Sequence, residues 1–449
     1  MNKFSSLRYL SIISLSFISA ISNLHAQDAS DKENQLTITA QLRPKFEYRD
    51  GNFQPLAQGL KPSALISQRS RLTFSYQYKN ALTLQVSPQT VTVWGQDALT
   101  QGASTSNGFG LFEAWAGIRT GEKTIIKAGR QVISLDDERF FGELDWAQGS
   151  RAHDAVSLHV ANKKADWKLF AAYNQNYREL YGNNLYNVAG SLFSTKDAAP
   201  YKWMQTAWGK FQIGKGNTLS ALVSNLGFQN AKNTADPAKT YFLQTLGLTF
   251  NHTGTNWKYQ VAGYLQQGKN LTGNSTDGHL ISLGIDRTIS KIWNLGLGAD
   301  YLSGNKVNNN LSAHNRAFVP YFGTNHKFYG SMDYFYAGNG HKNAGLEDFY
   351  LKTGFKPNAN FNLNVALHQF MAPVEIKEGS KTLPSNLGQE LDLDFGYSIN
   401  KYAKLTGGYS MYFNTPTLLY LKNVAQSGKV QQWAWISLNV NPKILYSKY

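Results

Sequence analysis

The chain contains no cysteine among its 449 residues. This absence excludes a disulfide framework and any zinc or iron–sulfur site built on thiolates, although it does not define the cellular compartment. Acidic residues are also scarce, since 29 Asp and Glu stand against 44 Lys and Arg, a net charge of +15. Such an excess suits nucleic acid, an anionic surface or an anionic solute. Aromatic side chains make up 13% of the chain, which argues against a disordered protein.

Long apolar runs are missing after the first 26 residues. The first eight of those residues include the basic Lys3 and Arg8 and no acidic residue. An apolar and serine stretch follows at 10–21, and the segment ends at Leu24-His25-Ala26. This order is typical of a secretory signal peptide, whose apolar core is shorter than a membrane helix. The alternative is an N-terminal core helix. We predict a signal peptide at 1–26 and one domain at 27–449 with a net charge of +13, and export argues against nucleic acid as a partner.

Apolar and polar residues alternate along most of the remaining chain. Because successive side chains of a strand point to opposite faces, each such segment has one apolar and one polar face. A soluble sandwich shows the same alternation, but its strands average about 5–6 residues, whereas membrane-spanning strands need about 9–11. The segments here are of the longer kind, with aromatic residues near their ends, as in the interfacial girdles of membrane barrels. The sequence therefore predicts an all-β fold, a transmembrane antiparallel β-barrel. The clearest apolar series are Leu36-Ile38-Ala40-Leu42, Leu72-Phe74-Tyr76-Tyr78 and Leu391-Leu393-Phe395-Tyr397, and the aromatic ends are Tyr48, Tyr76, Tyr78, Trp94, Trp167, Trp257, Trp293, Trp433 and Trp435.

Short and long connections alternate between these segments. Eight short turns and nine long loops make 17 connections and hence 18 strands, with both termini on the short-turn side. Bacterial outer-membrane barrels have this arrangement of short periplasmic turns and long extracellular loops. The short turns lie near 80, 121–122, 162–164, 214–216, 253–255, 290–291, 356–358 and 400–401, and the long loops at 50–67, 96–110, 132–152, 175–200, 227–240, 267–278, 303–346, 371–388 and 414–428.

The loop at 303–346 contains a segment, 328–336, that has the local pattern of a strand. Counting it would place a long loop on the short-turn side, so we assign it to the loop; the alternative is a slightly different strand number. A structureless loop of this length is uncommon in a compact domain. We therefore predict that 303–346 folds over or into the pore.

Basic side chains occupy the polar faces of the predicted strands. Because Arg or Lys facing lipid costs about 2–4 kcal/mol at mid-bilayer, these faces should point into the lumen. A lumen lined in this way attracts anions, and the guanidinium group suits carboxylates and phosphates. The alternative is that the charges pair across the lumen and hold the wall together. The predicted pore-lining residues are Arg43, Lys45, Arg69, Arg71, Arg119 and Lys127, and Glu390, Asp392 and Asp394 are expected to neutralise part of this wall.

The densest polar stretch runs from 129 to 155. It contains Gly129-Arg130-Gln131, a polar turn with Asp137-Glu138-Arg139 and Gly142, then Asp145-Trp146 with Gln148, and Arg151 with Asp154. This order resembles the alginate-export family of outer-membrane barrels. Further matches lie at 324–330 with Asp333 and at 387–392, so the resemblance covers the whole chain after the signal peptide.

The resemblance implies an 18-stranded porin-like barrel with an arginine-rich lumen that passes an anionic polysaccharide. It places Arg130, Arg139 and Arg151 at anion-binding positions, with Asp136 and Asp154 as partners in the constriction loop. The implied solute is an acidic oligo- or polysaccharide such as alginate, or another small anion. The other implied partners are outer-membrane lipid, lipopolysaccharide and the barrel assembly machinery, and no cofactor is predicted. The C-terminus departs from the pattern, because Pro442 and a short tail follow the last predicted strand and only Tyr446 and Tyr449 supply its aromatic end.

Catalysis and metal binding are weaker interpretations. His153 and His159 are six positions apart on one strand, about 20 Å at about 3.3 Å per residue, so they cannot share a substrate. His326 and His341 could bind a metal with Asp333, but hydrogen-bonded loop histidines are the more common case. A 22-stranded transporter barrel with a plug domain needs a longer chain than this one.

Two hypotheses remain: an outer-membrane channel for anionic solutes, and a non-conducting surface binding or adhesion barrel with a plugged lumen.

Overall fold

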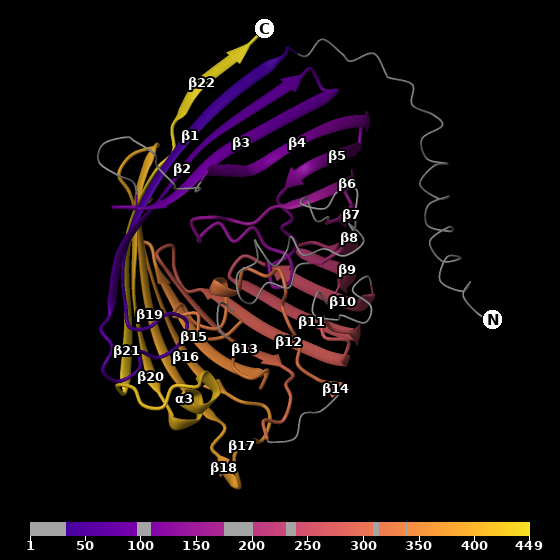
Figure 1. Ribbon diagram of the computed structural model, residues 1–449. Coiled ribbons are helices and arrows are strands. Elements are labelled where there is room, and N and C mark those ends of the chain that lie inside the picture. The colour runs from indigo at the N-terminus through magenta and orange to yellow at the C-terminus, as the bar shows by residue number, and fades with distance from the viewer. Residues whose placement is uncertain (1–32, 97–108, 175–200, 230–238, 309–313, 337–339) are drawn as a thin grey trace, which may run out of the picture.

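The computed structural model describes residues 33–96, 109–174, 201–229, 239–308, 314–336 and 340–449; the predicted signal peptide lies outside these ranges. Eighteen antiparallel strands form one closed barrel (Figure 1). They are β1 (Gln35–Arg49), β2 (Ser63–Tyr78), β3 (Leu82–Val93), β4 (Phe109–Gly121), β5 (Thr124–Gln131), β6 (His153–Ala161), β7 (Ala165–Tyr173), β8 (Trp203–Gly214), β9 (Asn217–Gln229), β10 (Thr240–Thr253), β11 (Trp257–Lys269), β12 (Ser275–Thr288), β13 (Trp293–Leu302), β15 (Leu346–Phe355), β16 (Phe361–Met371), β19 (Asn386–Ser398), β20 (Ala403–Asn414) and β21 (Val430–Val440).

The barrel closes between its first and last strands. β1 pairs with β2 on one side and with β21 on the other, where Phe46 lies opposite Ile436. After Pro442 the chain resumes pairing with β1 as β22 (Lys443–Lys448), so the short tail extends the eighteenth strand rather than leaving it. Closure pairs the strand edges with each other, which is what a sheet inside a bilayer requires.

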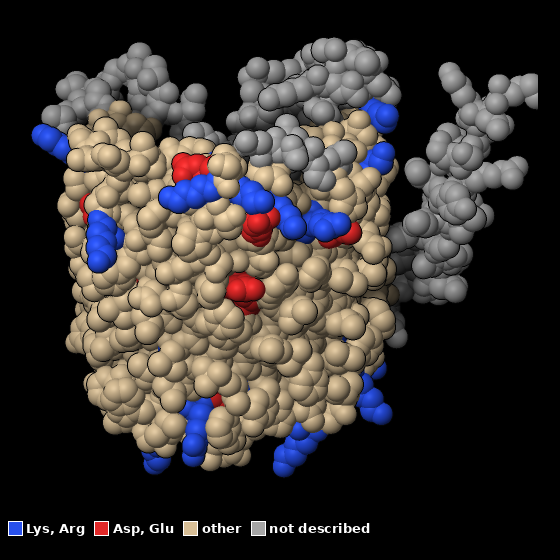
Figure 2. All heavy atoms as spheres, turned by 90° about the horizontal axis from the view of Figure 1, so that it is seen from below, with Lys and Arg blue, Asp and Glu red and all other residues tan. Residues whose placement is uncertain are grey.

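The barrel is apolar on its outside and polar on its inside. On β10, Leu248 is 58% exposed while the adjacent Thr249 is 1% exposed, and the same alternation recurs on β12 with Ile281 and Ser282. Figure 2 shows a wide band of the outer surface almost free of charged side chains, bordered at both edges by Lys and Arg. Trp94, Trp167, Trp257 and Trp293 are exposed, as girdle residues would be. Trp433 and Trp435 are not girdle residues, because they share the inward face of β21 with buried Ser437.

The remaining elements lie in the long connections. They are the two-residue strand β14 (His314–Asn315), the 3-10 turn η1 (Asn325–Lys327), the hairpin β17 (Ile376–Glu378) with β18 (Lys381–Leu383), and the helix α3 (Pro416–Lys422). The segment 328–336 contains no strand, so the expected loop assignment is confirmed. Within the described ranges, no helix has the length and hydropathy needed to cross a membrane.

Two of the long connections fold into the barrel and lie within its ring of strands in Figure 1. We call 132–152 the first inner loop and the described residues 303–308, 314–336 and 340–345 the second inner loop. Phe140 and Phe141 of the first and Phe318 and Tyr329 of the second are at most 2% exposed. The Phe140 ring packs against Phe141 and against the inward side chain of Tyr264 on β11, and Phe318 packs against the same Tyr264 ring. The lumen is therefore shaped by two loops as well as by the wall.

Candidate functional site

Two wall arginines hold the first inner loop by its backbone. Arg43 on β1 donates to the carbonyl oxygens of Asp145 (2.7 Å) and Ala147 (2.8 Å). Arg69 on β2, which is fully buried, donates to the carbonyl oxygens of Ala147 (2.5 Å) and Gln148 (2.7 Å). Both arginines lie on the inward face of the wall, and most of their N–H groups are used by the protein itself.

The Asp145 carboxylate gathers three guanidinium groups. Its oxygens lie 2.6 Å from Arg69, 3.6 Å from Arg43 and 3.9 Å from Arg71, and the Ser150 hydroxyl donates to it at 2.8 Å. Partial burial alone would raise the pKa of Asp145, but the positive charge and hydrogen bond of Arg69 outweigh that effect, so the pKa lies below its usual value. The carboxylate is therefore charged at neutral pH and offsets part of the basic wall.

The second inner loop is held by an acidic part of the wall that lies three strands from β1. Glu390 on β19 accepts the backbone N–H of Met332 at 2.6 Å, and Asp392 accepts that of Ser331 at 3.2 Å. Arg49 on β1 donates to the Met332 carbonyl at 3.0 Å. These two carboxylates thus bind loop backbone instead of neutralising the basic wall, which corrects the sequence-based expectation. The third residue of that trio, Asp394, accepts from Asn364 on the neighbouring strand at 2.9 Å.

The two inner loops also bind each other. The Gly142 N–H donates to the Phe322 carbonyl (2.8 Å), and the Thr324 N–H donates to the Glu138 carbonyl (2.9 Å). Arg151 donates to the carbonyl oxygens of Phe322 and Gly323, the latter at 3.1 Å. The predicted pore-lining Arg151 is therefore a cross-link between loops.

Glycine makes this close approach possible. A Cβ on Gly142 would collide with the Thr324 side chain and backbone, and a Cβ on Gly323 would collide with the Arg139 carbonyl. A further contact is a stack between Trp146 and His326, whose ring centroids are 3.5 Å apart. The His326 ring in turn pairs with Asp333 at 2.9 Å. The loops consequently form one bonded unit.

Arg139 lies at the centre of this unit with its charge fully paired. Its guanidinium is 2.8 Å from both Asp137 and Asp300, and it lies 4.0 Å above the Phe328 ring. Burial alone would lower the pKa of Arg139, but the charges of Asp300 and Asp137 raise it well above the usual value.

Asp136, predicted as a constriction-loop partner, fastens the first inner loop to a third part of the wall. It accepts hydrogen bonds from the Trp208 indole at 2.9 Å and the Ser220 hydroxyl at 2.5 Å. Burial raises the pKa of Asp136 above its usual value despite these bonds. Its neighbour Arg139 pairs with Asp137 rather than with Asp136. Asp136 is thus bound by the wall residues Trp208 and Ser220 and not by a residue of its own loop.

Two other predicted residues lie outside the lumen. Arg130 and Asp154 face each other across β5 and β6 and form a 3.0 Å ion pair with both side chains well exposed. On β6, Asp154 has the same parity as Val156, which is 49% exposed, whereas inward His153 is buried. This pair therefore lies on the outer face near the long-loop side, and its assignment to the pore and constriction loop was wrong.

The other predicted basic residues are on inward faces. Arg119 lies at the short-turn rim, where it donates to the carbonyl oxygens of Asn80 (3.1 Å) and Glu122 (3.0 Å). Lys45 pairs with Glu47 at 3.2 Å and lies 4.4 Å from the Trp146 ring.

A set of inward lysines near the short-turn side differs from these arginines. Among the described residues, none of its members has a carboxylate within 4.0 Å. The set, which we call the lumen lysines, comprises Lys127, Lys168, Lys210, Lys258 and Lys404. Lys127 lies 3.8 Å above the Trp115 ring and Lys168 lies 5.0 Å from the Trp208 ring, so aromatic faces hold two of the ammonium groups.

Two inward carboxylates of the wall have hydrogen-bond or ion-pair partners of their own. Glu113 accepts from Gln85 (2.5 Å) and Trp115 (3.0 Å), and Asp286 is 3.5 Å from Lys352. The sequence-based assignment to the pore overlooked Lys210. The alternation on β8 could have identified it, since Phe211 and Ile213 mark the outward parity and leave Lys210 on the same face as Trp208.

The histidines are engaged separately. His153 contacts the Tyr201 hydroxyl at 2.9 Å and His159 contacts Asp166 at 2.6 Å. His341 contacts the Gly345 carbonyl, and burial lowers its pKa to about 3, so it is neutral. Within the described ranges, no group of three or more His, Asp or Glu is arranged to hold a metal ion.

Comparisons with known proteins agree with this architecture. The model of the alginate export family matches residues 34–417. The structure is similar to Acinetobacter baumannii OccAB4, with a TM-score of 0.61 and 12% identity over 93% of this chain and 100% of that chain. It is also similar to Pseudomonas aeruginosa OccK11 (OpdR), with a TM-score of 0.57 and 13% identity over 94% and 100% of the two chains.

A third similar structure is Pseudomonas aeruginosa OpdK with vanillate, with a TM-score of 0.59 and 10% identity over 92% of this chain and 99% of that chain. At these identities the similarity concerns the fold. No curated protein matches the sequence. The family match spans most of the chain, and it agrees with the closed barrel and its inward loops: the chain belongs to the alginate export family of outer-membrane, porin-like barrels.

Proposed function

We propose that this protein is an outer-membrane channel that prefers anionic solutes, most of all acidic oligo- or polysaccharides such as alginate. The observation that carries the proposal is the set of lumen lysines, none of which has a carboxylate within 4.0 Å in the described part of the chain. Ammonium groups on a low-dielectric wall attract anions and raise their local concentration. The family match is compatible with such solutes, and so is the similar structure of OpdK with vanillate, which is a small carboxylate.

The same proposal includes the predicted signal peptide at 1–26, which would direct export. Outer-membrane lipid and lipopolysaccharide would then contact the apolar outer face, and the barrel assembly machinery would insert it. Transport by such a channel needs no catalytic group and no cofactor. The direction of movement is set by the solute gradient.

Bilayer conductance tests the proposal. The purified full chain is inserted into a planar bilayer under a KCl gradient, and the reversal potential gives the ratio of anion to cation permeability. We expect an anion preference that falls severalfold when all five lumen lysines are replaced by Gln, because that change removes five positive charges from the wall. Lys291→Gln with Lys356→Gln, two lysines in short turns, is the control for charge removal outside the lumen and should leave the ratio unchanged.

A second candidate function is the non-conducting binding or adhesion barrel. It is favoured by the bonds that join the two inner loops inside the lumen, for instance between Gly142 and Phe322. A correctly folded barrel that carries no current in the same bilayer would support this candidate and overturn the channel. An open barrel with cation preference would overturn anion selectivity alone.

A further inference from the structure

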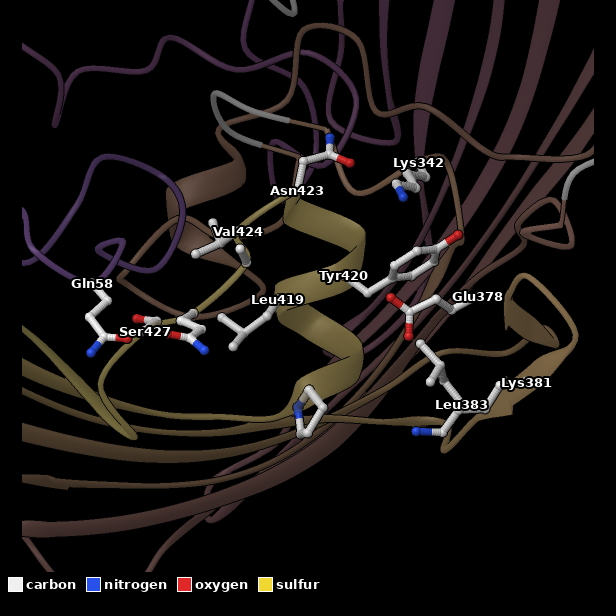
Figure 3. Close-up of a pocket in the computed structure, with 13 residues that line it drawn as sticks. Gln58, Lys342, Glu378, Lys381, Leu383, Leu419, Tyr420, Asn423, Val424 and Ser427 are labelled. Carbon is white, nitrogen blue, oxygen red and sulfur yellow. The ribbon is translucent and has the colours of Figure 1, made fainter.

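Four long connections line an open cavity of about 740 Å³ at the long-loop mouth of the barrel (Figure 3). One side is formed by α3 and the residues after it, and another by the β17–β18 hairpin. The second inner loop contributes Lys342, and the loop after β1 contributes Gln58. The cavity is separate from the lumen lysines, which lie near the short-turn side.

Bonds between these connections give the cavity a defined shape. The Gln58 N–H donates to the Gln426 carbonyl (2.9 Å), and the Ser427 hydroxyl donates to the Leu56 carbonyl (2.6 Å). The Tyr420 hydroxyl donates to the carbonyl of Lys377 in the hairpin at 3.0 Å. A cavity held in this way needs little ordering when a ligand binds, which favours affinity.

The lining combines an apolar surface with polar side chains. Leu383 and Val424 are buried and Leu419 is partly buried, so they present apolar surface to the cavity. The amide side chains of Gln58, Asn423 and Gln426 lie at its margin and are exposed. Amides can both donate to and accept from hydroxyl groups.

The charged lining groups are two lysines and one glutamate. The Lys342 ammonium lies 3.6 Å above the Tyr420 ring, and Figure 3 shows that ring between Lys342 and Glu378. Lys381 lies on the hairpin beside them. One carboxylate is too few for a calcium site, which takes six to eight oxygen ligands. The surplus of positive charge favours a ligand that carries a carboxylate.

We propose that this cavity, the mouth site, binds a carboxylated oligosaccharide at the long-loop end of the barrel. The ring hydroxyls meet the amides, an apolar face of the sugar lies against Leu419, and carboxylates of the sugar lie near Lys342 and near Lys381. The inference deepens the proposed function, because it gives the transported glycan a docking site outside the constriction. A volume of about 740 Å³ falls in the usual range of about 300–1,000 Å³ for small-ligand sites.

Calorimetric titration of the detergent-solubilised full chain with trigalacturonate tests the mouth site, with uncharged maltotriose as the comparison ligand. We expect trigalacturonate to bind and maltotriose to bind more weakly. The double variant Lys342→Gln/Lys381→Gln should weaken trigalacturonate binding about tenfold or more, since it removes two charge-assisted contacts. Ala425→Trp, which fills the cavity without changing a charge, should have a similar effect. Lys356→Gln/Lys401→Gln, two exposed lysines at the short-turn end, is the matched control.

Unchanged trigalacturonate binding in both the double variant and Ala425→Trp would overturn the mouth site, as would equal binding of maltotriose or no binding by the parent protein. The reversal potential of the double variant separates the two proposals. Lost binding with an intact anion preference supports the mouth site beside a functioning channel. Retained binding to a barrel that carries no current supports the mouth site and overturns the channel.

Discussion

The two halves of the lumen use positive charge in different ways. On the long-loop side, Arg43 and Arg69 are occupied by loop carbonyls and by Asp145, and Arg139 by two carboxylates. On the short-turn side, the lumen lysines have no such partner among the described residues. The positive charge that is left for a solute is therefore only part of the charge on the polar faces of the strands.

The chemistry of the two side chains accounts for this division. A guanidinium group has five N–H donors in a rigid fork and can bind several carbonyls and a carboxylate at once, as Arg69 does. An ammonium group is a compact, strongly hydrated charge on a flexible stem. Arginine is thus suited to fasten a loop and lysine to interact with a passing ion.

Asp145→Asn should break this contrast most strongly. The substitution removes a charge-assisted partner from three arginines, a loss of about 1.5–3 kcal/mol for a buried contact and less here because Asp145 is 43% exposed. We expect the first inner loop to loosen, the single-channel conductance to rise about twofold or more, and the anion preference to increase. Asp154→Asn, which removes the carboxylate of an ion pair on the outer face, is the control and should change neither quantity.

A matched pair of charge deletions sharpens the contrast. Arg43→Gln should mainly increase current noise and conductance, because Arg43 donates to the loop carbonyls at 145 and 147. Lys258→Gln should mainly lower the ratio of anion to cation permeability, because Lys258 has no carboxylate within 4.0 Å in the described part of the chain. The same reversal-potential measurement serves for both. Equal effects of the two substitutions on selectivity would contradict the division of roles.

Acid pH tests the long-loop half. The pKa of Asp145 is lowered in the folded protein, so its ion pairs contribute fully above the usual Asp pKa of about 3.9 and are lost as pH falls through the lower folded value. The difference in conductance between the parent and Asp145→Asn should be constant from neutral pH to about pH 4.5 and shrink only in stronger acid. A difference that already vanishes near pH 6 would show that another group holds the loop.

The smallest effect is expected from Arg130→Gln. Its ion pair with Asp154 is exposed, with 40% and 60% of the two side chains accessible, and exposed pairs contribute about 0–1 kcal/mol. Thermal unfolding and ion selectivity should therefore stay near those of the parent. A clear loss of anion preference would place Arg130 in the lumen after all.

Much of the barrel could be predicted from the sequence. The alternation at Leu36–Leu42 and at Leu391–Tyr397 identifies strand faces, because the two-residue period of a strand is a local property. The lengths of the connections identify the strand number and the side on which the termini lie. Trp433 and Trp435 misled the prediction. An aromatic residue near a strand end suits a girdle, but it suits equally well an inward edge-to-face contact such as that of Trp433 with Trp146, or a cation–π contact such as that of Trp435 with Lys45.

The roles of individual charged residues could be predicted less well from the sequence. Arg130 shares a motif with Gln131, yet neighbouring residues of a strand face opposite ways, and only the observed parity shows that Arg130 faces outward. Nothing near Arg69 in the sequence indicates that Asp145, 76 positions later, will pair with it. The same holds for Arg139 and Asp300, which are 161 positions apart.

The sequence by itself determined the closed barrel, its apolar outer face and its basic interior, because alternation and segment length act through local backbone geometry. Only the tertiary structure decided which basic side chains are left without a close carboxylate in the described part of the chain and can therefore interact with a solute. That choice depends on where two long loops fold inside the ring, and their positions are determined by hydrogen bonds and ion pairs between residues far apart in the chain, such as Met332 with Glu390 and Arg69 with Asp145. For this reason arginines such as Arg43 and Arg69, which the sequence alone suggests as anion-binding residues, hold a loop in place. The lumen lysines are inward cations that keep no carboxylate within 4.0 Å among the described residues.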